Sequence, residues 1–126
     1  MAWYEEWIAR AKSNLELAQV KIIHHICYEE LCFQSQQAAE KALKGLLIYY
    51  SVEPEFTHNI EILLNELEKV TEIPDNVKEA TKLTIYAVQT RYPGEYDEIT
   101  KKEYEESIKI AQDCVNWVES KITTAR

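Results

Sequence analysis

The chain has 126 residues, the length of one domain, and we treat residues 1–126 as a single folded unit. It contains only 2 glycines and 3 prolines, while Glu, Lys, Ala, Leu and Ile are abundant, and this composition favours helix over sheet. The formal net charge of −8 argues against broad, non-specific binding of nucleic acid, although dispersed Lys and Arg can still form a local cationic groove.

The first predicted helix covers residues 2–23. Its apolar positions recur at helical spacing and line one face: Trp7, Ala11, Leu15, Ala18 and Ile22. No glycine or proline marks its end. We place a break near residues 23–26, because one helix through residues 2–50 is too long for a compact domain.

The second predicted helix covers residues 27–50, and the rest of the chain is organised around it. Small and apolar residues share one face: Tyr28, Cys32, Ser35, Ala39, Ala42, Leu46 and Tyr49. Polar residues follow its edge: Gln36, Gln37, Glu40, Lys41 and Lys44. The small residues let other helices approach closely, which suits the middle of a bundle. The spacing of Glu40 and Lys44 predicts an ion pair worth a few tenths of a kcal/mol at most.

The third predicted helix covers residues 58–71. It follows a loop over residues 51–56, because the residue before Pro54 is pushed out of the helical region. Thr57 is its predicted N-cap. The buried stripe of this helix consists of branched aliphatic residues: Ile60, Leu63, Leu64 and Leu67.

Two more helices complete the predicted fold. The fourth begins at Pro74 and ends near Arg91, because Pro93 and Gly94 follow. The fifth covers residues 101–122, and Thr100 opens it as an N-cap. Short loops between helices of similar length imply antiparallel neighbours. We therefore predict an all-α, up-down antiparallel bundle of about five helices.

Several kinds of site are missing from the sequence. The three cysteines, Cys27, Cys32 and Cys114, have no zinc-like spacing, and we expect reduced thiols, no metal site and no cofactor. Neither glycine belongs to a phosphate-binding loop, and no serine-nucleophile motif is present. No apolar run reaches the roughly 18 residues of a membrane span, and the N-terminus lacks the regions of a signal peptide. We expect a cytoplasmic protein with no membrane partner.

A few polar residues are candidates for chemistry. His58, at the start of the third helix, is either an acid–base group or a turn residue bonded to the nearby chain. Arg91 ends the fourth helix, where it either binds a phosphate or carboxylate or only complements the helix dipole. Lys41 and Lys44 either add positive charge to such a site or belong to a solvated helix edge.

The run Gln-Gln-Ala-Ala-Glu-Lys-Ala-Leu-Lys over residues 36–44 resembles the second-helix signature of the HEPN domain. Three other stretches match in order: residues 7–18, then His58-Asn59-Ile60 with Leu63-Leu64, then Thr90-Arg91-Tyr92-Pro93. The last is similar to a motif of the subgroup often encoded beside a minimal nucleotidyltransferase. The resemblance extends over roughly residues 3–120.

This resemblance implies a bundle that forms a homodimer with a cleft between subunits, and that binds nucleotide or RNA. Many HEPN proteins are the toxin half of toxin–antitoxin pairs, and the toxic ones are metal-independent RNases that use Arg-x(4–6)-His. No histidine follows Arg91 at that spacing, so His58 is the candidate replacement. In related pairs the nucleotidyltransferase adenylylates a tyrosine beside the motif, which makes Tyr92 and Tyr96 the modification candidates.

Three functions follow from these observations. The first is a homodimeric binding module for a nucleotide or RNA that partners a minimal nucleotidyltransferase in a toxin–antitoxin-like system. Its predicted ligand-binding residues share positive charge or hydrogen-bonding groups: Gln37, Lys41, Lys44, Arg91 and Tyr92. The second is a metal-independent toxin RNase with Arg91 and His58 as catalytic residues. The third is a structural helical adaptor that binds no small ligand.

Overall fold

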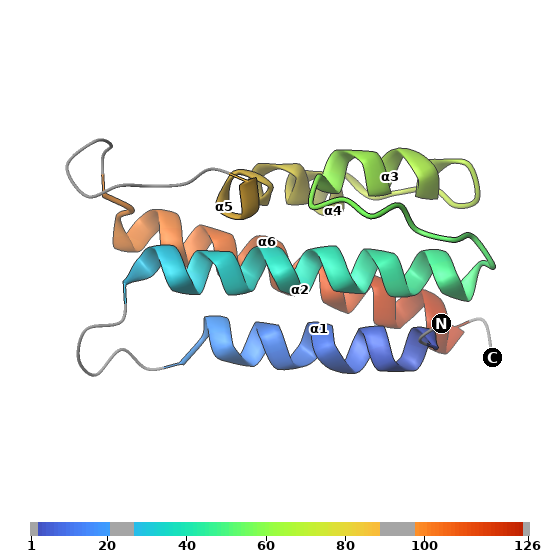
Figure 1. Ribbon diagram of the computed structural model, residues 1–126, viewed down its shortest axis with the longest axis horizontal. Helices are drawn as coiled ribbons and strands as arrows, with labels where there is room; N and C mark the ends of the chain where they lie inside the picture. Colours follow the sequence, from blue (N-terminus) through green and yellow to red (C-terminus); the bar gives the residue numbers. More distant parts are fainter. Residues whose placement is uncertain (1–2, 21–26, 89–97, 125–126) are drawn as a thin grey trace.

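The computed structural model describes residues 3–20, 27–88 and 98–124. All regular elements in these ranges are helical: α1 (Tyr4–Ala18), α2 (Tyr28–Tyr49), α3 (Ile60–Glu68), α4 (Asp75–Lys78), the 3₁₀ helix η1 (Glu79–Leu83), α5 (Ile85–Val88) and α6 (Lys101–Thr124). The long helices α1, α2 and α6 run side by side, and the row of short helices lies across α2 from α1 (Figure 1). The predicted all-α bundle is confirmed.

Helix α2 is the centre of the bundle and contacts α1, α3, α5, α6 and η1. The small and apolar face predicted for it is buried from Cys32 to Leu46 and half-buried at Tyr28 and Tyr49, and Ala39, Ala42 and Leu46 are fully inaccessible to solvent. At Gly45 a Cβ atom would lie 2.8 Å from Ile8 Cδ1 and 3.1 Å from Trp7 Cβ. A glycine here therefore lets α1 pack directly against the α2 backbone.

Helix α3 is shorter than predicted, and its N-cap is Asn59 rather than Thr57. The Asn59 side chain accepts a hydrogen bond from the Glu61 amide at 3.0 Å, whereas the Thr57 hydroxyl accepts one from the Asn59 amide at 3.0 Å. The Ile60 amide is satisfied by the Thr84 hydroxyl, 3.1 Å away on the following segment. The predicted bounds and N-cap of α3 were therefore wrong. Its predicted inner face is confirmed, because the four residues of the stripe are buried.

The segment predicted as a single fourth helix is divided into α4, η1 and α5. Threonine favours a continuous helix weakly, because its hydroxyl competes for backbone groups. Thr81 donates to the Lys78 carbonyl at 3.2 Å, and Thr84 accepts from the α3 backbone. The predicted end of this helix near Arg91 lies outside the described residues.

The start of α6 agrees with the prediction, whereas the end of α1 does not. Thr100 caps α6 as expected, because its hydroxyl accepts from the Glu103 amide at 3.1 Å. Helix α1 ends at Ala18, before the predicted residue 23. The Tyr104 hydroxyl of α6 donates to the Ala18 carbonyl at 2.7 Å, which satisfies a carbonyl that the helix end leaves open.

The three cysteines are free thiols, as expected, with Cys32 and Cys114 buried and Cys27 exposed. Burial raises the pKa of Cys114 to about 12, so this thiol stays protonated. No helix in the described ranges is both long and apolar enough to cross a membrane.

Candidate functional site

Helix α2 carries a buried ion pair on the edge that faces the loop before α3. The Lys44 ammonium lies 2.9 Å from Glu40 Oε2, and the two side chains are only 10% and 4% exposed. The spacing predicted this pair, and the pair is present. Of the two alternatives for Lys44, the solvated helix edge is wrong, because its side chain is buried. Charges at this depth are tolerated only when hydrogen bonds satisfy them on every side.

The second oxygen of Glu40 lies within hydrogen-bond distance of two further groups. Gln36 Nε2 donates to Oε1 at 2.9 Å, and His58 Nδ1 lies 2.9 Å from the same oxygen. Burial by itself raises the pKa of Glu40, but the bonds from Lys44, Gln36 and His58 outweigh it and hold the pKa below its usual range. Glu40 is therefore ionised at neutral pH.

His58 lies at the surface end of this network, two residues before α3 begins. Its backbone carbonyl accepts a hydrogen bond from Gln36 Nε2 at 3.1 Å, and its ring bonds to Glu40. Its side chain is nevertheless 60% exposed. Two bonds to α2 thus fix both the backbone and the ring of His58 while leaving the rest of the imidazole open to solvent.

A second chain of polar contacts connects α2 to α1. Lys41 Nζ donates to Asn14 Oδ1 at 2.9 Å, and Asn14 Nδ2 donates to Gln34 Oε1 at 2.6 Å. Partial burial lowers the pKa of Lys41, and the positive charge of Arg10 lowers it further. Lys41 is a half-buried cation held in place by an amide rather than neutralised by a carboxylate.

We call these residues the α2 polar edge: Asn14, Gln34, Gln36, Gln37, Glu40, Lys41, Lys44 and His58. Gln37 belongs to it because its amide donates to Gln36 Oε1 at 2.7 Å. In the described ranges no buried side-chain nitrogen or oxygen lacks a hydrogen-bond partner. The buried atoms of the edge are therefore all hydrogen-bonded, and they hold the side chains that reach the surface.

The structure brings together four of the sequence-predicted site residues: Gln37, Lys41, Lys44 and His58. Arg91, Tyr92 and Tyr96 lie outside the described residues. Sequence reasoning missed the role of Glu40 and Gln36 as the groups that hold His58. The available signal was their spacing, because Gln36, Glu40 and Lys44 recur every four residues and form one polar stripe beside the apolar face.

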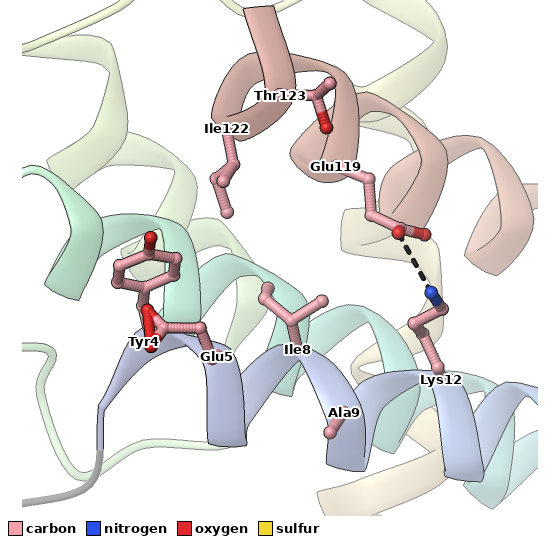
Figure 2. A pocket seen from close by; sticks show the side chains of 8 residues that line it. All are labelled: Tyr4, Glu5, Ile8, Ala9, Lys12, Glu119, Ile122 and Thr123. Atoms are coloured by element: carbon pink, nitrogen blue, oxygen red, sulfur yellow. Dashed lines mark hydrogen bonds and ion pairs between the residues drawn. The ribbon is translucent and has the colours of Figure 1, made fainter. Parts of the chain in front are cut away.

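Among the described residues, two surface hollows lie away from this edge. The larger, of about 280 Å³, separates α1 from α6, with Ile8 and Ile122 directed into it and a Lys12–Glu119 ion pair of 3.0 Å across its rim (Figure 2). The smaller, of about 200 Å³, lies between η1 and α6 beside Tyr86 and Glu103. Within the described ranges, no cluster of His, Cys, Asp or Glu is arranged to hold a metal ion.

Comparisons with known proteins place the chain in a family. The model of the HEPN domain matches residues 4–121. Among solved structures, the chain resembles TT1696 from Thermus thermophilus, with a TM-score of 0.80, 34% identity, and coverage of 96% of this chain and 99% of that one.

It also resembles ST0689, described as an archaeal HEPN homologue, with a TM-score of 0.74, 34% identity, and coverage of 97% of this chain and 99% of that one. A search among proteins with curated descriptions finds no match. The family model covers nearly the whole helical bundle, including the α2 polar edge, and the chain therefore belongs to the HEPN domain family.

Proposed function

We propose that this HEPN domain is a binding module for a nucleotide or a short RNA, and that the ligand lies along the α2 polar edge. The observation that carries the proposal is the buried Glu40–Lys44 pair, which holds the exposed imidazole of His58 on the same helix edge as Lys41. A buried ion pair gives little net stability compared with apolar packing. Ionisable groups with shifted pKa values cluster at functional sites, and the pKa of Glu40 is lowered.

The chemistry of the edge suits an anionic ligand with polar rings and hydroxyls. Among the described residues, the Lys41 ammonium donates to an amide oxygen and to no carboxylate, so it can still neutralise a phosphate. Gln37 and His58 add hydrogen-bonding groups on the same side of α2. Lys44 acts differently from the sequence expectation, because its charge is committed to Glu40 and supports the site from inside.

The resemblance to the HEPN subgroup extends the proposal beyond the described residues. We expect Arg91 to add a guanidinium for phosphate and Tyr92 to lie beside it. We also expect a homodimer, in which the exposed apolar side chains of Phe56 and Ile85 are candidates for burial. Light scattering on the purified protein measures the dimer directly, and a monomeric mass would remove this part of the proposal.

Equilibrium binding tests the main proposal. Fluorescence anisotropy with a labelled ATP analogue and a labelled single-stranded RNA is expected to show saturable binding. Lys41→Ala should weaken it about tenfold, the size of one charge-assisted contact. Lys109→Ala is the matched control, because it removes an equally positive but exposed side chain from α6. Absence of binding by the folded wild type, or equal loss in both variants, would contradict the proposal.

The proposed protein partner is a minimal nucleotidyltransferase, in a two-component system of the toxin–antitoxin type. Co-expression of the chain with the nucleotidyltransferase encoded nearest to it, followed by affinity purification, is expected to recover a complex. Incubation of the pair with ATP is expected to add an adenylyl group to Tyr92 or Tyr96, read by mass spectrometry of the peptides. A phenylalanine variant of each tyrosine identifies the modified position.

The second candidate function is a metal-independent RNase, favoured by the carboxylate-bound imidazole of His58. In this reading Arg91 binds the phosphate and His58 transfers the proton. Cleavage of a mixed RNA substrate in EDTA that is lost in both Arg91→Ala and His58→Ala would support it. A folded wild-type protein that binds RNA without cleaving it would leave the binding module as the function.

A further inference from the structure

The two nitrogens of the His58 imidazole have different surroundings. Nδ1 lies 2.9 Å from Glu40 Oε1, on the buried side of the ring. Nε2 has no hydrogen-bond partner among the described residues, and the side chain is 60% exposed. One nitrogen is therefore engaged by Glu40, and no group in the described part of the chain occupies the other.

The buried partner decides which nitrogen carries the proton. An ionised carboxylate can only accept hydrogen bonds. Glu40 is kept ionised by the ammonium of Lys44 and the amide of Gln36, which reach its two oxygens at 2.9 Å each. His58 Nδ1 must then donate, and the neutral ring is left with a bare Nε2 that accepts.

We propose that Glu40 is a positioning residue that fixes His58 in the Nδ1–H tautomer, so that Nε2 accepts a hydrogen bond from the ribose 2′-hydroxyl of a bound RNA. A phosphate oxygen cannot pair with a bare Nε2, because both are acceptors, and the phosphate is left to Lys41. The 2′-hydroxyl is the group that separates RNA from DNA. This inference rests on the proposed function and narrows its ligand to ribonucleotides.

Imidazole NMR tests the role of Glu40 without any ligand. Long-range ¹H–¹⁵N spectra at about pH 9, where histidine rings are neutral, are expected to show a proton on Nδ1 of His58 and none on Nε2. In Glu40→Gln, the amide oxygen stays with the Lys44 ammonium and the amide NH₂ faces the ring. Nδ1 must then accept, and the proton moves to Nε2.

Glu61→Gln is the matched control for this measurement, because it removes the same charge from an exposed position three residues after His58. It is expected to leave the tautomer unchanged. An Nε2–H tautomer in the wild type would overturn the role of Glu40. So would a tautomer that is the same in Glu40→Gln and the wild type.

Binding of matched oligonucleotides tests the ribose contact. Labelled oligoadenylates of about six nucleotides, one RNA and one DNA, compare the two sugars on a single-stranded ligand. The wild type is expected to prefer RNA about three- to tenfold, the effect of one partly exposed hydrogen bond. His58→Asn keeps an amide donor near the position of Nδ1 and loses Nε2, so its RNA affinity should fall to its DNA affinity.

The outcomes separate this inference from the proposed function. Equal binding of RNA and DNA by the wild type would overturn the ribose contact and leave the binding module intact. A preference for RNA that survives in His58→Asn would assign the contact to another residue and also overturn it. Absence of binding to either oligonucleotide would overturn the proposed function and the ribose contact together, and the tautomer measurement would still decide the role of Glu40.

Discussion

The apolar face of α2 and the buried part of its polar edge are both hidden from solvent, but they are stabilised differently. Ala39, Ala42 and Leu46 on the apolar face are fully inaccessible, and Gln36 and Glu40 on the polar edge are 0% and 3% exposed. The apolar face stabilises the fold in proportion to the apolar area that it removes from water, so removing part of a side chain removes part of that stability. The polar edge gains little from burial and depends on every partner being present.

Removal of one charge from the polar edge should have the largest effect. Glu40→Ala leaves the Lys44 ammonium buried without its carboxylate, and we expect the free energy of unfolding to fall by about 3–5 kcal/mol. Urea denaturation followed by circular dichroism measures it. The control is Glu61→Ala on the exposed face of α3, which should change stability by less than about 0.5 kcal/mol. Similar losses in both variants would mean that the Glu40–Lys44 pair has no special role.

Truncation of the apolar face should cost somewhat less on average. Leu46→Ala removes methyl groups from a fully buried position and leaves a cavity, with an expected loss of about 2–5 kcal/mol. Leu46→Met conserves volume and should lose less than about 1.5 kcal/mol. If conservative substitutions on the polar edge also cost much less stability than truncations, the two sides of α2 would not differ in how they stabilise the fold.

The contact between α1 and α2 offers a smaller test of the apolar side. Gly45→Ala places a Cβ within 3.1 Å of Trp7 Cβ, and this overpacking outweighs the better helix propensity of alanine. We expect a net loss of about 1 kcal/mol in the same urea experiment. The Ile8→Val background removes the Cδ1 atom that lies 2.8 Å away, so the loss should shrink there. An unchanged loss would place the strain elsewhere.

The pH dependence of stability sharpens the comparison from the polar side. The pKa of Glu40 is lowered in the folded protein, so the unfolded chain binds more protons as the pH falls below the ordinary value of 4.5. The stability that Glu40 contributes is complete above that value and is lost as the pH drops toward the lower folded pKa. Glu40→Gln should therefore reduce the slope of the free energy of unfolding against pH in this range. Leu46→Met should lower the free energy of unfolding by the same amount at every pH and leave the slope unchanged.

Much of the architecture could be predicted from the sequence. The apolar stripe of α3 and the Thr100 cap of α6 were predicted from spacing and composition, because helical periodicity and N-capping are local properties. The failures came where a group from elsewhere in the fold intervened. Thr84 from the next segment bonds to the start of α3, and Tyr104 of α6 bonds to the last residue of α1.

For the candidate site too, some residues could be predicted from the sequence and others could not. His58 and Lys41 were predicted as candidate site residues from their type and position, and the structure places both on the α2 polar edge. Arg91 is a prediction that the described residues do not test. The function of Glu40 was not visible, because an i,i+4 spacing to Lys44 predicts the same pair whether it is solvated or buried. Only the packing of α1 and of the loop before α3 around this edge determined its burial.

The sequence alone therefore determined the helical class, the central place of α2 and the HEPN resemblance, since periodicity, small-residue spacing and a contiguous motif are all recorded locally along the chain. The tertiary structure decided which polar residues are buried and what they hold. Gln36 and Glu40 bond to His58, which follows them by 22 and 18 residues in the sequence. Such contacts form only when separate segments of the chain pack together. Their hydrogen bonds, and not their residue types, convert a polar stripe into a site that orients an exposed imidazole.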